Sequence, residues 1–386
     1  MPDLEPQSAT HAEATEAIVS ETLSAVPSAA GSGVADGAPD HARFATEELA
    51  MVLSHYDIGP IDKIKPFPRG SRKAPKSVLR SAFGLFLLKR RAKGKENPHR
   101  VAFCHSVQLH LMDRQFPLPR LLGTRRDNNS MLKLNGQVYE LFEFIRGNPY
   151  DQSLEATTDA GRVLGLMHRL LDDFECPYES SSGSFHNSSS VKSALEHAPH
   201  ALRRVYGDAV DERGQELADG LAFLRQTYTE AADRAEAKGL STWPTSVVHS
   251  DFHPGNLLYR GSRVVAVIDF DSARRLPRVV DVANGALQFS ILGGRKPSEW
   301  PEYLDETRFR RFVRGYESVP DTVLNERECE VVVPLMIEAL IAEVAVPIAQ
   351  TGRFGTMSGM EVFDVVGRKV RWLLEHEPRL TEALAE

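Results

Sequence analysis

Short apolar runs separated by turns predict a small antiparallel sheet in the first third of the chain. Runs bounded by turn residues predict five strands, at 61–67, 76–81, 85–89, 117–124 and 130–145. The last run contains Asn135-Gly136, which is typical of a tight hairpin turn. Apolar residues recur at helical spacing after Asn97-Pro98, so a helix is expected over 98–114. A short helix at 45–55 precedes the first strand.

The rest of the chain has the pattern of helices, interrupted by one strand pair. Helical periodicity covers 157–172, and it covers 191–238 with breaks. Gly239 suits the C-terminal end of the latter helix. A β-hairpin is predicted around the turn at 260–262, and residues 281–386 are mostly helical. The chain is therefore expected to have an α+β fold.

The length of 386 residues suggests two lobes. Residues 1–45 are expected to form a disordered acidic tail, because 1–42 carry seven acidic residues and no Lys or Arg. An N-terminal lobe is placed at 46–146 and a C-terminal lobe at 147–386. The apolar stretch 331–349 is interrupted by two glutamates and two prolines, which favours a buried helix over a membrane span.

Charge and cysteine content narrow the possible partners and the compartment. Residues 61–100 carry thirteen Lys and Arg against two acidic residues, although the whole chain has a net charge of −7. Only Phe67 and Phe83 lie near the basic residues of 61–83, so a stacking surface for nucleic acid is not supported. The three cysteines form no CxxC pair, and the N-terminus lacks the basic and apolar regions of a signal peptide. We expect a cytoplasmic protein that binds neither nucleic acid nor membranes.

The segment VVHSDFHPGNLL, residues 247–258, places several reactive side chains between two apolar pairs. The hairpin that follows would fold Asp269 back beside Asn256, and a carboxylate with an amide oxygen suits Mg²⁺. Asp251 lies earlier on the same loop and could accept a proton from a hydroxyl. Lys89, at the end of an apolar strand, could reach nucleotide phosphates as a point charge. These are the parts that phosphoryl transfer requires.

Two other interpretations of this region stay open from the residues alone. His249, Asp251 and His253 alternate along the chain, so on an extended strand they would share a face and could bind zinc. Asp271 could be a further metal ligand or an ordinary turn residue.

The chain resembles the aminoglycoside phosphotransferase and choline kinase-like family over roughly 61–290. The motifs that carry the resemblance are HSDFHPGN (249–256), VIDFDSA (267–273), FLLK (86–89), YELFEFIRG (139–147) and LGLMH (164–168). The resemblance implies a bilobal protein-kinase-like fold, with a small antiparallel-sheet lobe and a mainly helical large lobe. ATP and Mg²⁺ would bind in the cleft between the lobes.

The resemblance also implies a role for each matching residue. Asp251 would be the catalytic base, and His249 would orient the catalytic loop. Asn256 and Asp269 would be metal ligands, and Lys89 would bind the phosphates. Two further assignments follow in the same way: a brace for the loop at Asp281, and adenine-binding backbone groups at Phe142, Glu143, Phe144 and Ile145.

The sequence departs from the family pattern at two places. Family members commonly pair the strand lysine with a helix glutamate, but the helix at 98–114 contains no glutamate. We expect His105 or Gln108 to take that place beside Lys89. The loop at 68–75 has a single glycine, so basic side chains and backbone groups would hold the phosphates instead of a glycine-rich loop.

Three polar residues near these motifs are assigned ordinary structural roles. Glu140 and Glu143 are expected to face solvent, because a hinge contributes backbone groups. His168 is expected to pack at a helix end.

The function implied is transfer of the γ-phosphoryl group of MgATP to a hydroxyl of a small molecule. The acceptor classes implied are amino alcohols, amino acids, sugars and aminoglycosides. The alternative is a pseudokinase that binds nucleotide or acts as a scaffold, which the missing helix glutamate favours. A protein kinase is disfavoured, because helix resumes by about residue 281 and leaves no room for a long activation segment.

Overall fold

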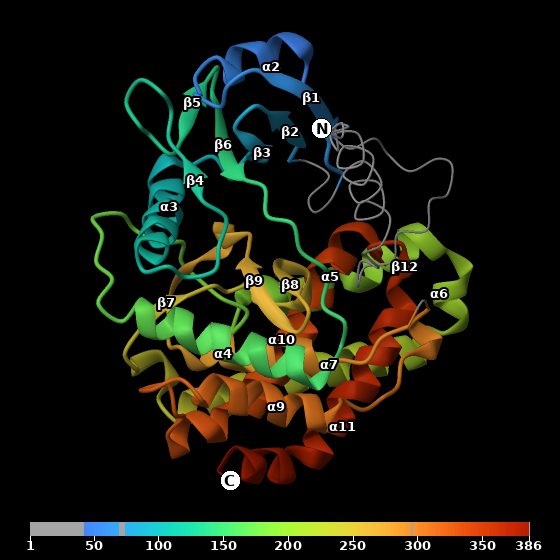
Figure 1. Ribbon diagram of the computed structural model, residues 1–386. Helices are drawn as coiled ribbons and strands as arrows, with labels where there is room; N and C mark the ends of the chain where they lie inside the picture. Colours follow the sequence, from blue (N-terminus) through green and yellow to red (C-terminus); the bar gives the residue numbers. More distant parts are fainter. Residues whose placement is uncertain (1–41, 69–73, 295, 386) are drawn as a thin grey trace, which may run out of the picture.

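The computed structural model describes residues 42–68, 74–294 and 296–385. An antiparallel sheet comes first in the chain and stacks on a larger, mainly helical part (Figure 1). This order confirms the predicted fold class. The expected acidic tail up to residue 41, and residues 69–73 of the loop after the first strand, lie outside the described residues.

The sheet has six strands, one more than the five predicted. They are β1 (Ile61–Pro66), β2 (Lys76–Ser81), β3 (Gly84–Arg90), β4 (Leu121–Leu122), β5 (Leu132–Leu134) and β6 (Gln137–Glu143). The strand order is β1-β2-β3-β6-β4, with β5 paired to β6. Segment 130–145 forms two strands instead of one, because Asn135 and Gly136 form the tight turn between them, with φ values of 50° and 73°.

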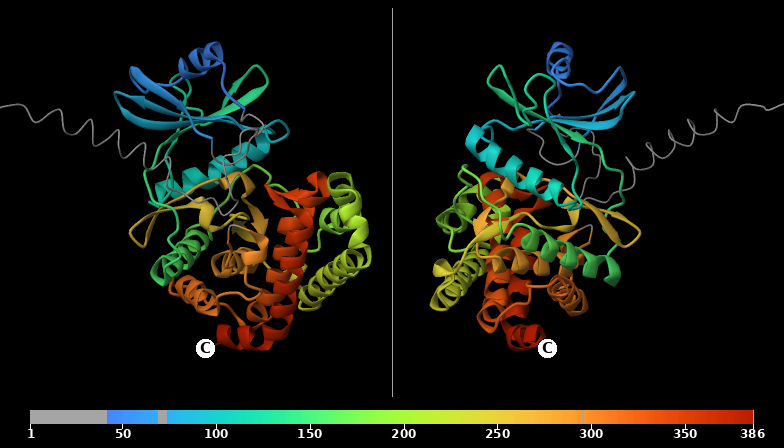
Figure 2. Two further views of the ribbon diagram at one scale, coloured as in Figure 1. Left: turned by 90° about the vertical axis from the view of Figure 1, so that its right-hand side faces the viewer. Right: turned by 60° about the vertical axis from the view of Figure 1, so that its left-hand side comes forward.

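Alternation along β3 gives the sheet two chemically different faces. Phe86 and Leu88 join a small apolar core with residues of α2 (Thr46–Leu53). Lys89 and Arg91 lie on the other face, where their side chains contact acidic residues that follow β9 (Arg263–Val267). Helix α3 (Pro98–Asp113) lies between the sheet and the helical part in both views of Figure 2.

The helical part is built around the long buried helix α10 (Glu326–Thr351). Its helices are α4 (Leu154–Leu170), α5 (Ser189–Tyr206), α6 (Asp208–Glu212), α7 (Gly214–Ala237), α8 (Val279–Ser290), α9 (Glu306–Glu317), α10 (Glu326–Thr351) and α11 (Gly359–Ala385). Its strand pairs are β7 (Ser246–Val248) with β10 (Arg274–Leu276), β8 (Leu257–Arg260) with β9, and β11 (Arg353–Phe354) with β12 (Met357–Ser358). The predicted helices and the hairpin around residue 261 are confirmed.

Among the described residues, α10 alone is long and apolar enough to cross a membrane by length and composition. However, 78% of its most apolar window is buried inside the protein, where it packs against α5, α7, α8 and α11. Its Glu338 is fully buried and accepts hydrogen bonds from the ring of His186 and the backbone N–H of Asn187. These features are those of a core helix.

Helices α4 and α9 cross at very short distance because glycines face each other's backbone. A methyl group on Gly161 would collide with the carbonyl oxygen of Phe312, and one on Gly315 would collide with that of Thr158. The crossing brings His168 of α4 to Tyr316 of α9, whose hydroxyl lies 2.9 Å from the imidazole Nδ1. The same imidazole reaches the loop that carries the candidate site.

Candidate active site

The hairpin β8–β9 brings the predicted metal ligands together. Leu257 pairs with Val267, and the backbone N–H of Ile268 donates to the carbonyl oxygen of Asn256 at 2.9 Å. Asp269 therefore follows directly after the residue opposite Asn256. Asp269 has φ +64°, a left-handed conformation that turns the chain out of the hairpin.

Asn256 is oriented by Asp251. The amide nitrogen Nδ2 of Asn256 donates to the backbone oxygen of Asp251 at 2.8 Å and to its carboxylate Oδ2 at 3.1 Å. Both partners can only accept, so the amide nitrogen faces Asp251 and the amide oxygen is left for another ligand. An amide oxygen beside the carboxylate of Asp269 is a donor set that fits Mg²⁺. The Asp251 side chain itself is about half exposed, at 48%.

One buried carboxylate, that of Asp281, binds the backbone of the loop that carries Asp251. Asp281 accepts hydrogen bonds from the backbone N–H of His249 at 2.5 Å and of Ser250 at 2.8 Å. The ring of His168 donates to the same carboxylate from 3.3 Å, so His168 does more than pack at a helix end. The ring of His249 donates from Nε2 to the carbonyl oxygen of Ile268 at 3.1 Å, which ties the loop to the hairpin. This geometry is consistent with the expected brace and orienting residue.

The histidines of the alternative zinc site have other hydrogen-bond partners. His249 uses its ring on Ile268, and His253 Nδ1 accepts from the backbone N–H of Gly255 at 3.0 Å. Within the described ranges, no three His, Cys, Asp or Glu side chains form a metal-binding group. Asp271 is also occupied, since Lys89 and Arg91 bind its two carboxylate oxygens at 2.7 and 2.9 Å.

Lys89, on strand β3, contacts the residues that follow the β8–β9 hairpin. Its Nζ is 2.7 Å from Asp271 and 3.3 Å from Asp269, and the side chain is buried. Although burial lowers the pKa of Lys89, the two aspartates raise it above its usual value, so the ammonium form persists. In return, the Lys89 ammonium lowers the pKa of Asp269 to about 2. The structure thus joins the predicted phosphate-binding lysine to a predicted metal ligand.

Two rows of side chains run across the inner face of the sheet, because directly paired residues of neighbouring strands share a face. Val78, Leu87 and Phe142 form an apolar row across β2, β3 and β6. The next row is ionic and consists of Lys76, Lys89 and Glu140. An apolar surface beside a cationic one suits a nucleotide base and its phosphates. Sequence reasoning missed Val78, Leu87 and Lys76, whose common face follows only from the strand register.

Glu140 corrects two expectations. It was expected to face solvent, but its side chain is 0% exposed, whereas Glu143 is exposed as predicted. His105 was expected to contact Lys89, but its Nε2 lies 2.6 Å from Glu140 Oε1 instead. Gln108 donates to the backbone of its own helix, at Cys104. The helix therefore presents an imidazole to a strand carboxylate, and the carboxylate is the group near Lys89.

The segment 142–145 offers fewer backbone donors than expected. The N–H of Glu143 donates to Arg120 and that of Phe144 donates to Leu85, at 2.8 and 2.9 Å. The N–H of Ile145 has no hydrogen-bond partner among the described residues. Of these three N–H groups, that of Ile145 is therefore the one left for a ligand within the described residues, while Phe142 contributes its side chain to the apolar row.

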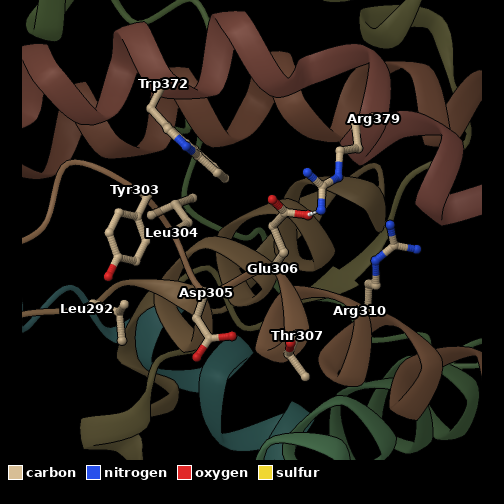
Figure 3. A pocket seen from close by; sticks show the side chains of 9 residues that line it. All are labelled: Leu292, Tyr303, Leu304, Asp305, Glu306, Thr307, Arg310, Trp372 and Arg379. Atoms are coloured by element: carbon tan, nitrogen blue, oxygen red, sulfur yellow. Dashed lines mark ion pairs between the residues drawn. The ribbon is translucent and has the colours of Figure 1, made fainter.

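A separate pocket of about 600 Å³ lies between α9, α11 and the segment before α9 (Figure 3). The ion pair between Arg379 and Glu306, at 2.8 Å, lies in it. None of the predicted site residues lines this pocket. It is not part of the candidate active site.

Comparison with known proteins agrees with this geometry. A family model described as "Phosphotransferase enzyme family" matches residues 63–323. The homoserine kinase of Zymomonas mobilis subsp. mobilis is 27% identical over 241 residues, which cover 61% of this chain and 68% of that protein. The first curated relatives are matched over 62–68% of their own lengths.

Solved structures share the fold. The microcompartment-associated aminopropanol kinase has a TM-score of 0.62 at 14% identity, covering 86% of this chain and 97% of that one. Amicoumacin kinase in complex with AMP-PNP, Ca²⁺ and amicoumacin has a TM-score of 0.59 at 13% identity, covering 86% and 92%. The expected kinase-like fold is thereby confirmed.

Proposed function

Because the chain belongs to the phosphotransferase enzyme family and is an ATP-dependent kinase of small molecules, we propose that its acceptor is an alcohol that also carries an amine. The observation that carries this proposal is a second carboxylate, Glu343 of α10, which is hydrogen-bonded by Gln288 of α8. One turn earlier on α8, Asn284 donates to the backbone oxygen of Phe252, the residue after Asp251, so α8 joins Glu343 to the Asp251 loop. In the proposed complex, the acceptor hydroxyl lies at Asp251 and the attached ammonium group binds Glu343.

In the proposed reaction, Asp251 accepts the proton of the acceptor hydroxyl as its oxygen attacks the γ-phosphorus. The bond from that phosphorus to the β–γ bridging oxygen breaks, and ADP leaves. Asn256 would position Asp251 through its two hydrogen bonds, and Lys89 would contact the nucleotide phosphates. Asn256 and Asp269 would hold Mg²⁺, which neutralises charge on the phosphates when bound.

The surroundings of Glu343 support the choice of an amine. Gln288 of α8 donates to the Glu343 carboxylate at 2.5 Å. The side chain is exposed, yet enough protein surrounds it that desolvation raises its pKa, with Asp251 also raising it and His253 lowering it. An ammonium group would favour the ionised form of this carboxylate and complete its hydrogen bonding. Homoserine and aminopropanol, named by two of the similar proteins, each combine a hydroxyl with an amine.

An acceptor screen tests the proposal. Purified protein with MgATP is incubated with homoserine, aminopropanol, ethanolamine, choline and, as amine-free alcohols, glycerol and glucose. We expect ADP formation well above the acceptor-free rate with at least one amine-bearing alcohol. Turnover confined to amine-free alcohols would contradict the proposed acceptor class, and the absence of turnover with any acceptor would favour the pseudokinase alternative.

Replacing Glu343 with glutamine should raise the KM for the amine-bearing acceptor by about tenfold or more, since a charge-assisted hydrogen bond becomes a neutral one. The KM for ATP should stay unchanged. Glu361→Gln, at an exposed position on α11, is the matched control. If Glu343→Gln alters ATP binding and not acceptor binding, the carboxylate does not belong to the acceptor site.

A further inference from the structure

We infer that Glu140, on strand β6, positions Lys89 for nucleotide binding in place of the absent helix glutamate. This inference rests on the proposed role of Lys89 as the phosphate-binding lysine. Glu140 would be a positioning residue, because it acts through Lys89 and touches no substrate.

The strand register brings the two side chains together. Lys89 and Glu140 are direct partners in the β3–β6 ladder, so both point to the inner face of the sheet. Lys89 Nζ lies 3.8 Å from Glu140 Oε2. That oxygen is buried and has no hydrogen-bond partner among the described residues, so the Lys89 ammonium is the cation that faces it, while Arg91 binds the other oxygen.

The other oxygen of Glu140 is held by three donors. Arg91 donates to Oε1 from Nε at 2.9 Å and from Nη2 at 2.6 Å. His105 donates to the same oxygen from Nε2 at 2.6 Å, and Ser130 contacts the other ring nitrogen of His105 at 2.9 Å. A fully buried carboxylate fixed in this way cannot rotate away from Lys89.

The alternative partners of Lys89 have other tasks in the proposed reaction. Asp269 is needed by the metal, and Asp271 is shared with Arg91 at 2.9 Å. Glu140 lies on the sheet side and faces no substrate group in the proposed reaction. It can therefore hold the Lys89 ammonium when the nucleotide draws it away from the hairpin. In this chain helix α3 supplies a hydrogen-bond donor, His105, and strand β6 supplies the negative charge, the carboxylate of Glu140.

Nucleotide affinity tests the assignment, and it does so independently of the acceptor. The dissociation constant of ATP is measured by calorimetry with Mg²⁺ and in EDTA, together with steady-state kinetics if an acceptor is known. Glu140→Asp keeps the negative charge but draws the carboxylate back by one methylene from Lys89, Arg91 and His105 alike, and Glu140→Gln removes the charge. We expect ATP binding to weaken by about tenfold in Glu140→Gln, less in Glu140→Asp, with kcat at saturating ATP nearly unchanged.

Two further variants separate positioning from general destabilisation. Glu328→Gln breaks another Arg–Glu pair, with Arg278, in which the glutamate is buried and the arginine partly buried; it should lower the melting temperature without weakening ATP binding. The double substitution Glu140→His with His105→Glu moves the carboxylate to the helix while keeping an imidazole and a carboxylate in contact. It should bring ATP affinity back to within about threefold of the original protein, a small difference on the scale of one lost charge pair.

Normal ATP binding by the Glu140 variants would overturn the inference. Folded Glu140→Asp and Glu140→Gln proteins that bind ATP normally would assign Glu140 a structural role only. If Glu140→Gln does not fold, Glu140→Asp decides. Unchanged ATP affinity in Glu140→Asp would place the positioning of Lys89 with Asp271 instead.

Discussion

Asp251→Asn is expected to lower phosphoryl transfer by about 10²–10⁴-fold, the usual scale for a general base, while MgATP still binds. The substitution keeps an oxygen where Asn256 Nδ2 now donates, so the loop geometry should survive. What disappears is the carboxylate that could accept the hydroxyl proton. The backbone bonds of His249 and Ser250 to Asp281 do not involve the Asp251 side chain, which further protects the fold.

Single-turnover transfer to the best acceptor and calorimetric binding of MgATP measure the two halves of this prediction. Asp233→Asn, an exposed position on α7, is the matched control and should behave like the original protein. Turnover within a few-fold of the original in Asp251→Asn would remove this residue from the role of base.

Asp269→Asn should abolish the part of ATP binding that depends on Mg²⁺, an expected loss of about 100-fold or more, because the metal would lose its one anionic protein ligand. Asparagine is preferred to alanine here, since it tolerates the φ of +64°. In EDTA the same variant should bind ATP at least as well as the original protein, because Lys89 no longer has an ion pair with this side chain.

The pH dependence follows from the same ion pair. Lys89 lowers the pKa of Asp269 to about 2, below the value near 4 of an unfolded aspartate. The pair therefore stabilises the folded protein above about pH 4, and this stabilisation is lost as the pH falls toward 2.

Asp271→Asn separates the two possible metal sites. If it abolishes Mg²⁺-dependent binding and Asp269→Asn does not, the metal binds at Asp271.

The parts of the protein that the sequence predicted well are local. Strand β2 and helix α3 were placed almost to the residue, because apolar spacing and turn residues act over a few positions. The catalytic loop and its hairpin are contiguous in sequence, so a turn at Gly261 was enough to bring Asp269 back to Asn256.

The parts that were missed depend on contacts between distant segments. Nothing in the sequence around Glu140 shows that β6 pairs with β3, from which it is separated by a helix and two other strands. Glu140 is surrounded by apolar neighbours, and a glutamate is normally buried only when its charge is compensated. The apolar residues Val138, Tyr139 and Leu141 on both sides of Glu140 were the one available signal in the sequence, and the structure buries all four. Glu343 was likewise treated as an interruption in an apolar helix, because its connection to the Asp251 loop through α8 follows only from the packing of α8 and α10.

The amide protons of His249 and Ser250 both end on Asp281, a side chain with no exposed surface. Exchange of such protons with deuterium requires that the surrounding helices open, so it should be slow with or without nucleotide. The amide of Ile145 has no partner among the described residues and should exchange quickly until a ligand covers it. Deuterium uptake by the two segments, 247–252 and 142–148, would thus report ligand arrival against a fixed internal reference, with no substitution or label in the protein.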